Sequence, residues 1–144
     1  MKNPKAIKLF IVDDDTVFLK ALEIEFRSNT DYIIETYVSG ELCLENLTHQ
    51  PDIIILDYNL DGVNPSAMNG IETLDKIKQT NPQIPVIILS SQDKIEVAVK
   101  CMQHKAFDYV TKSETAFLRL KKAIHIILKH QKLEKKLNWY MERM

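Results

Sequence analysis

Acidic residues directly follow two of the apolar runs in this chain. They are Asp13, Asp14 and Asp15 after residues 7–12, and Asp57 after residues 53–56. If both runs are neighbouring strands of one parallel sheet, these carboxylates meet at a single edge of it. Carboxylates gathered in this way repel one another unless a hard divalent cation or a lysine lies among them. The spacing therefore predicts a site for a positive charge at that edge.

Other polar groups follow the third, fourth and fifth apolar runs, namely Asn59, Ser90 and Lys112. Carboxylates, a backbone carbonyl and waters form an all-oxygen site of the kind that Mg²⁺ or Mn²⁺ prefers. A lysine can neutralise an oxyanion, and a hydroxyl can hydrogen-bond a phosphoryl oxygen. Since an aspartate can accept a phosphoryl group, the chemistry implied is phosphoryl transfer onto Asp57.

Five strand and helix units must position these groups. Runs rich in β-branched residues predict strands at residues 7–12, 33–38, 53–57, 85–90 and 107–111. Helical spacing of apolar residues predicts helices at 17–27, 40–47, 70–79, 94–104 and from about residue 114 onward. We expect an α/β fold with one doubly wound (βα)5 domain, a parallel sheet in the order 2-1-3-4-5 and an extended C-terminal helix. The order reverses between the strands that precede Asp13 and Asp57, where such folds bind ligands.

The composition does not indicate a particular class of binding partner. The chain has 144 residues, a net charge of −1 and 27% charged residues, which predicts one domain without a global field for nucleic acid or membrane. No apolar stretch approaches a membrane span, so a cytoplasmic location is expected. Cys43 and Cys101 lie far from each other and from any metal-binding spacing, which favours structural thiols. The four histidines are interpreted as surface or helix residues.

Five segments, in chain order, resemble the receiver domains of two-component response regulators. They are Phe10-Ile11-Val12-Asp13-Asp14, Ser39-Gly40-Glu41, the segment from Pro51 to Asp57, the segment from Ile84 to Ser90, and the segment from Phe107 to Lys112. The resemblance assigns residues 5–128 to a receiver domain and leaves residues 129–144 as a helical extension.

This resemblance also implies roles for the polar residues. Asp57 would be the phosphoacceptor, and Asp13, Asp14, Asp57 and the carbonyl of Asn59 would hold Mg²⁺ or Mn²⁺. Ser90 would close on the phosphoryl group, Lys112 would pair with it, and Tyr109 would be the aromatic side chain that follows the switch. The phosphoryl group would come from a sensor histidine kinase or a histidine phosphotransfer protein.

Two departures from the family pattern stand out. Ser113 follows Lys112, where the family usually has a proline after a cis peptide bond, and a cis bond is costly before any other residue. The loop after Asp57 runs from residue 60 to residue 68, roughly five residues longer than usual. Asp61 in this loop is either a further metal ligand or, as we favour, a solvated turn residue.

The function expected is therefore a phosphorylation-dependent signalling switch, and not an enzyme beyond assisting its own phosphoryl transfer and slow dephosphorylation. A pseudo-receiver, which keeps the fold as an interaction module without phosphorylation, is one alternative. A haloacid-dehalogenase-type phosphatase is another, but that class uses a second aspartate two residues after the nucleophile, where this chain has Asn59.

The C-terminal helix has two apolar stripes. The first would pack on the sheet, and the second follows alternating steps of three and four residues through Ile126, His130, Leu133, Leu137, Tyr140 and Met144. This spacing predicts a parallel two-stranded coiled coil that makes a homodimer or transmits the switch, while a solvated linker helix remains the alternative. A second candidate dimer surface is the face of helix four, strand five and helix five.

Overall fold

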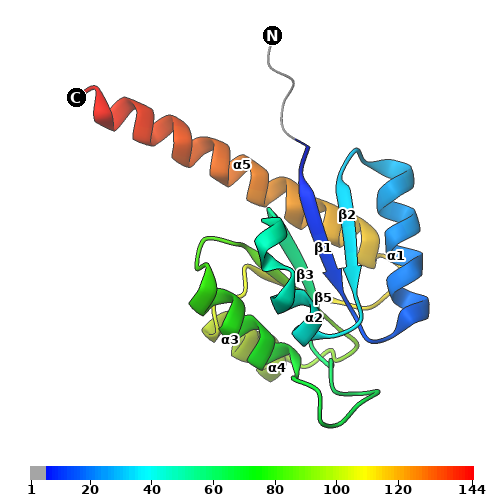
Figure 1. Ribbon diagram of the computed structural model, residues 1–144. Helices are drawn as coiled ribbons and strands as arrows, with labels where there is room; N and C mark the ends of the chain where they lie inside the picture. The colour runs from blue at the N-terminus through cyan, green and yellow to red at the C-terminus, as the bar shows by residue number, and fades with distance from the viewer. Residues whose placement is uncertain (1–5) are drawn as a thin grey trace.

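The computed structural model describes residues 6–144 as one five-stranded parallel sheet with helices on both faces. The strands are β1 Lys8–Val12, β2 Ile33–Tyr37, β3 Ile53–Asp57, β4 Val86–Ser90 and β5 Asp108–Thr111. Their order is β2-β1-β3-β4-β5 (Figure 1), which confirms the predicted topology. The predicted start of the domain at residue 5 lies outside the described residues.

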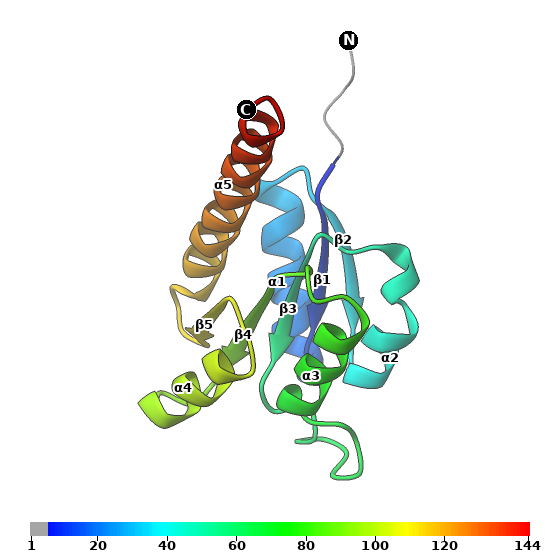
Figure 2. The ribbon, with the colours of Figure 1, turned by 90° about the vertical axis from the view of Figure 1, so that its left-hand side faces the viewer.

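Two helices cover one face of the sheet and three cover the other (Figures 1 and 2). The helices are α1 Thr16–Asn29, α2 Gly40–Glu45, α3 Gly70–Thr80, α4 Ile95–Gln103 and α5 Ala116–Glu142, with a short 3-10 helix η1 at Leu47–His49. Buried residues of α1 and α5 belong to one hydrophobic cluster, and those of α2, α3 and α4 belong to a second. This confirms the expected doubly wound arrangement.

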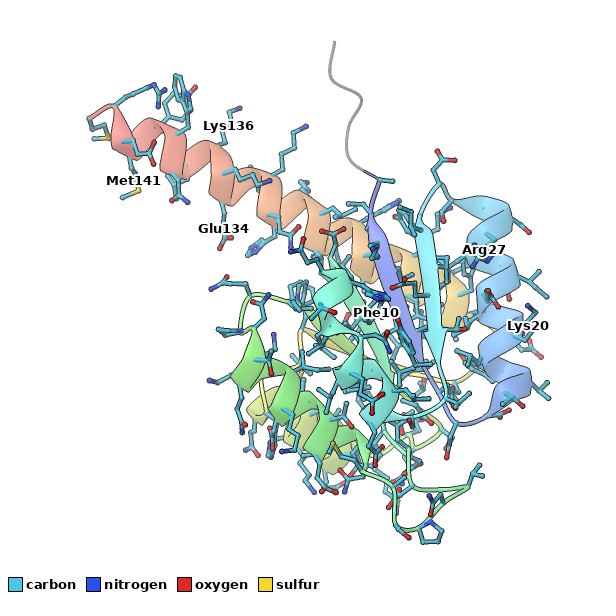
Figure 3. The ribbon with its side chains drawn as sticks, viewed as in Figure 1. Phe10, Lys20, Arg27, Glu134, Lys136 and Met141 are labelled. Atoms are coloured by element: carbon cyan, nitrogen blue, oxygen red, sulfur yellow. The ribbon has the colours of Figure 1, made fainter. Side chains whose placement is uncertain are left out.

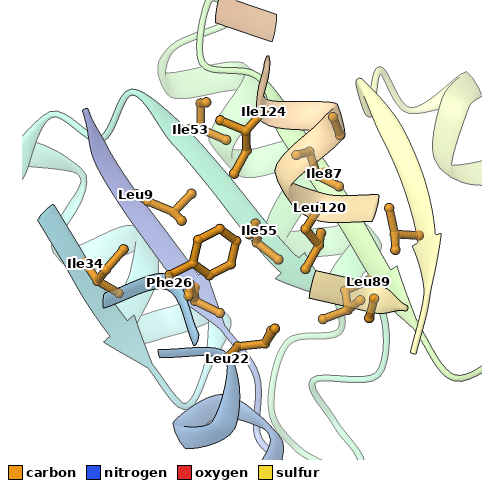
Figure 4. Packing of buried hydrophobic residues seen from close by; sticks show 14 of the residues in the cluster. Leu9, Leu22, Phe26, Ile34, Ile53, Ile55, Ile87, Leu89, Leu120 and Ile124 are labelled. Carbon is orange, nitrogen blue, oxygen red and sulfur yellow. The ribbon is translucent and has the colours of Figure 1, made fainter. Parts of the chain in front are cut away.

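The central strands supply both hydrophobic clusters because their side chains alternate between the two faces. In β1, Leu9 and Ile11 join the α1 and α5 side, whereas Phe10 and Val12 join the other. Figure 4 shows the first of these clusters, which includes Phe26 of α1. Every residue of β3 and β4 is buried, as expected for strands covered on both faces. Each large side chain removed from water contributes about 1.5–3 kcal/mol to stability.

Helix α5 is longer than the domain that it covers. Its 27 residues span roughly 40 Å, and its C-terminal part projects away from the sheet (Figure 1). Its buried residues are Ala116, Leu120, Ala123, Ile124 and Ile127. Within residues 6–144 no helix is long and apolar enough to cross a membrane.

Candidate functional site

The carboxylates of Asp13, Asp14 and Asp57 come together at the carboxyl edge of the sheet. Strand pairing puts Val12 beside Leu56. Asp13, which follows β1, and Asp57, the last residue of β3, therefore lie side by side. Asp13 is fully buried and Asp57 is 2% exposed, whereas Asp14 is partly exposed. One oxygen from each of the three carboxylates lies within 4.8 Å of the others. The acidic cluster that the sequence predicts therefore forms.

Lys112 enters the acidic cluster from the end of β5. Its Nζ lies 2.8 Å from Asp13 Oδ2 and 3.5 Å from Asp57 Oδ1. The ammonium group also lies 4.7 Å from the centre of the Phe18 ring, a cation–π contact from α1. The peptide bond to Ser113 is trans, as are all peptide bonds in residues 6–144. A trans bond without the usual proline thus still brings the lysine to the carboxylates.

The pKa values of both Asp57 and Lys112 are raised, for different reasons. Burial, reinforced by the negative charge of Asp13, raises the pKa of Asp57 to about 7, although Lys112 and a backbone hydrogen bond at Asn59 act against this. Burial by itself would lower the pKa of Lys112, but the nearby carboxylates of Asp13, Asp57 and Asp15 outweigh it and the pKa is raised. The cluster therefore carries more negative charge than its lysine neutralises.

Asp13 and Asp15 also shape the backbone between β1 and α1. Asp13 Oδ1 accepts a hydrogen bond from the Asp15 N–H at 2.9 Å. Asp15 is the N-cap of α1, because its Oδ1 accepts from the N–H groups of Val17 and Phe18 at 3.2 Å each. Asp15 therefore serves as a helix cap, and Asp13 and Asp14 remain for the site.

A pocket of about 470 Å³ opens over the acidic cluster. It is lined by Asp14, Asp15, Thr16, Asp57, Asn59, Gly62, Val63, Ser91 and Lys112. The pocket thus brings Asn59 to the carboxylates, as expected. Asp61 does not join the acidic cluster of the described residues and lies on a separate depression with Lys100.

Ser90 and Tyr109 are linked through one loop rather than aimed into this pocket. Ser90 is fully buried, and its hydroxyl accepts a hydrogen bond from the Gln92 N–H at 3.0 Å. The Tyr109 hydroxyl donates to the Gln92 carbonyl, and its ring is partly buried against the second hydrophobic cluster. The two predicted switch residues therefore both contact the segment between β4 and α4, where Ser91 rather than Ser90 lines the pocket.

The donor set fits a hard divalent cation. All the available ligand atoms are oxygens, and three carboxylates face the single positive charge of Lys112. A divalent cation would balance the remaining two negative charges, and oxygen-only sites with one or two carboxylates are typical of Mg²⁺. The raised pKa of Asp57 has the same origin, because it reflects uncompensated negative charge in a buried position.

Several contacts of the site and its surroundings were not predicted from the sequence. The Phe18 ring contacts Lys112, and the Val63 N–H contacts Asp14. Each contact joins residues that are far apart in the sequence. Two histidines contact carboxylates: His49 pairs with Glu35 at 3.0 Å, and His104 pairs with Asp75 at 2.8 Å. Neither His49 nor His104 lines the pocket over the acidic cluster, and neither do their partners Glu35 and Asp75. This agrees with surface roles for these histidines.

Comparison with known proteins agrees with the fold. The family model for the response regulator receiver domain matches residues 9–125. A five-stranded parallel sheet in this order, with helices on both faces, matches the fold of receiver domains. This chain belongs to the response regulator receiver domain family.

Relatives share this part of their chains. A protein-glutamate methylesterase/protein-glutamine glutaminase of Clostridium acetobutylicum is 33% identical over 115 residues, which cover 77% of this chain and 32% of that protein. The DNA-binding transcriptional regulator NtrC of Klebsiella pneumoniae is 35% identical over 104 residues, which cover 72% of this chain and 21% of NtrC. The matched parts thus span about a fifth to a third of these relatives, whose names describe the whole proteins.

A solved structure resembles the fold closely. The signal receiver domain of a putative LuxO repressor protein from Vibrio parahaemolyticus superposes with a TM-score of 0.78 and 26% identity, covering 92% of this chain and 98% of that domain. The shared fold extends over nearly the whole of that domain.

Proposed function

We propose that this chain is a phosphorylation-driven switch in which Asp57 accepts a phosphoryl group. The observation that carries the proposal is the placement of a buried carboxylate, Asp57, between two further carboxylates and the ammonium of Lys112. Such a setting suits a nucleophile that must hold a dianionic group, because Lys112 would meet part of the charge of the product and a divalent cation held by the carboxylates would meet the rest.

The transfer itself is a simple exchange of bonds. One Asp57 oxygen forms a bond to phosphorus while the bond from phosphorus to a donor histidine nitrogen breaks, and that nitrogen keeps the electron pair. A sensor histidine kinase or a histidine phosphotransfer protein would supply the phosphohistidine. Lys112 would then pair with a phosphoryl oxygen, which its position 3.5 Å from Asp57 Oδ1 allows.

Asp13, Asp14, Asp57 and the Asn59 carbonyl would hold Mg²⁺ or Mn²⁺ in this function. When bound, the cation neutralises charge on the phosphoryl oxygens during transfer. Asp13 positions Lys112 through the 2.8 Å contact between them. Ser90 would provide a hydroxyl to the phosphoryl group. Asp57 is among the residues that line the pocket over the acidic cluster, and a donor would reach it from this pocket.

The proposal is tested by phosphorylation in solution. Incubation with acetyl phosphate and Mg²⁺ should add one phosphoryl group that hydroxylamine removes, detected by mass spectrometry, and Asp57→Asn should abolish it. Asp61→Asn is the matched control, since Asp61 lies outside the acidic cluster and its loss should leave the adduct intact. If no adduct forms and beryllium fluoride leaves the amide spectrum unchanged, the pseudo-receiver alternative is correct.

We also propose that the projecting half of α5 pairs with a second copy of this chain. Leu133, Leu137, Tyr140 and Met144 are each more than half exposed and follow the coiled-coil spacing. At about 100° per residue this seam lies roughly 100° around the helix from the buried Ile127, so the domain leaves it free. In a parallel pair, Lys129 would lie opposite Glu134 of the second copy, which is a favourable pairing of charges across the seam.

A further inference from the structure

The long loop after β3 is fastened to the acidic cluster. The Val63 N–H donates to Asp14 Oδ2 at 3.0 Å, across 49 positions of sequence. Gly62 approaches the same carboxylate so closely that a Cβ there would lie 3.4 Å from Asp14 Oδ2 and 3.6 Å from the Asn59 carbonyl oxygen. The loop therefore lies against one carboxylate oxygen of Asp14 and against the Asn59 carbonyl oxygen, and we assign both of these residues to the metal.

The loop has a defined conformation of its own between residues 60 and 69. Asn64 holds its turn, since the Ser66 N–H donates to Asn64 Oδ1 at 3.1 Å and the Ala67 N–H donates to the Asn64 carbonyl at 2.9 Å. At its other end the Met68 N–H donates to Glu41 Oε2 on α2 at 2.9 Å. The loop thus bridges Asp14 and α2 at the carboxyl edge of the sheet, from which it projects in Figures 1 and 2.

A backbone N–H and a metal ion make opposing demands on one carboxylate oxygen. The N–H points the positive end of its dipole at Asp14 Oδ2, and a cation bound to that oxygen would face this positive end at close range. A hydrogen bond to an ionised carboxylate is also among the stronger ones in a protein, so giving it up has a cost. A cation that binds Asp14 Oδ2 therefore competes with the loop contact for that oxygen.

We infer that Val63 is a further positioning residue of this site, whose N–H holds Asp14 in the metal-free protein and is displaced when a divalent cation binds. The contact lowers metal affinity and ties the position of the loop to metal occupancy. Because the Val63 side chain is 76% exposed on the rim of the pocket, its displacement also changes the surface that a phosphodonor meets above Asp57. This inference rests on the proposed metal dependence of the site.

Removal of the N–H tests the competition directly. Val63→Pro deletes the donor, and the preceding Gly62 has no Cβ to clash with the proline ring. We expect Val63→Pro to bind Mg²⁺ on the order of tenfold more tightly than wild type in calorimetric titrations. Val63→Ala keeps the N–H and should match wild type. Ser66→Pro, which breaks a hydrogen bond inside the loop without touching Asp14, should also match wild type.

A second readout follows the amide itself. In the wild-type chain, hydrogen exchange of the Val63 amide should be slow without metal and should accelerate at saturating Mg²⁺, while the Met68 amide stays protected. Equal Mg²⁺ affinities for Val63→Pro and wild type, or an equal gain in Ser66→Pro, would overturn the inference alone. A wild-type chain that binds no Mg²⁺ at tens of millimolar would overturn the inference together with the metal part of the proposed function.

Discussion

The Lys112 ammonium lies closer to Asp13 than to Asp57, at 2.8 Å against 3.5 Å. The lysine thus neutralises the fully buried Asp13 and leaves Asp57, the proposed phosphoacceptor, less completely paired. Burial and the neighbouring charge of Asp13 outweigh the effect of Lys112, so the pKa of Asp57 is raised despite a cation nearby. The same lysine therefore has a structural partner in the free protein and is within reach of a phosphoryl group on the other carboxylate.

Loss of the Lys112 charge should destabilise the fold strongly. Lys112→Met would leave Asp13 buried without a cation, and breaking a buried pair in this way costs about 3–5 kcal/mol. We expect that loss in the free energy of unfolding, measured by urea denaturation at pH 8. Lys20→Met breaks an exposed pair with Glu23 and should change it by less than about 1 kcal/mol. Similar losses in the two variants would mean that Asp13 is not held by Lys112.

The metal-free protein should become more stable as the pH falls from about 8 toward 5. The folded-state pKa of Asp57 is about 7 against an ordinary value of 3.8, so between these values the folded state binds a proton that the unfolded state does not. Stability from this group therefore rises as pH falls through about 7. Asp57→Asn should raise the free energy of unfolding at pH 8 by on the order of 1–3 kcal/mol, and the gain should shrink by pH 5. A pH-independent gain would contradict the assignment.

Most of the fold and the acidic cluster follow from local sequence signals. The run Ile53-Ile54-Ile55-Leu56 is typical of a strand covered on both faces, and the aspartate after such a strand must lie at the carboxyl edge. The Val63 contact with Asp14 has no such signal, because it depends on how a loop without regular structure folds back. The hydroxyl direction of Ser90 was likewise unpredictable, since a rotatable group takes whichever partner the finished loop offers.

Lys105 should be a site where glycine stabilises the protein. It follows α4 in the left-handed conformation, with φ of 74°, and the next N–H, of Ala106, donates to the Cys101 carbonyl at 3.1 Å. A side chain in this conformation costs roughly 1 kcal/mol. Lys105→Gly should therefore raise the free energy of unfolding by about 0.5–1 kcal/mol. Lys105→Ala removes the same charge beside Lys78 but keeps a Cβ. If Lys105→Ala raised the free energy of unfolding as much as Lys105→Gly, the cause would be the lost charge and not the backbone conformation.

Ser90 should couple phosphorylation to the β4–α4 segment. Its hydroxyl and that of Tyr109 both contact Gln92, so a turn of Ser90 toward a phosphoryl group would release one of the two contacts. Ser90→Ala should still accept a beryllium fluoride group at Asp57, but the amide shifts of α4 and β5 should fall to about half or less of those in wild type. Ser91→Ala provides the control, and equal shifts in Ser90→Ala and wild type would remove Ser90 from the switch.

The apolar seam of α5 should make the protein a dimer. The proposed pair would bury Leu133, Leu137 and Tyr140. Trp139 lies off the seam, where its ring is 3.8 Å from the Arg143 guanidinium and makes an edge contact with the Tyr140 ring at 5.0 Å between centroids. Glu134 and Lys136 lie on different sides of the helix in Figure 3, as residues flanking a seam should. Leu137→Lys places a charge in the seam and should give monomers, while Trp139→Lys adds the same charge outside it and should remain dimeric.

Sedimentation at tens of micromolar separates these outcomes. A chain ending at His130 keeps the buried residues of α5 but loses most of the seam, so it should stay folded and sediment as a monomer. Beryllium fluoride should raise the fraction of the full chain that is dimeric only if the conformational change at Asp57 extends to α5. If the full chain and the shortened chain are both monomers with and without beryllium fluoride, the seam does not pair copies of this protein, and the projecting half of α5 is a solvated linker.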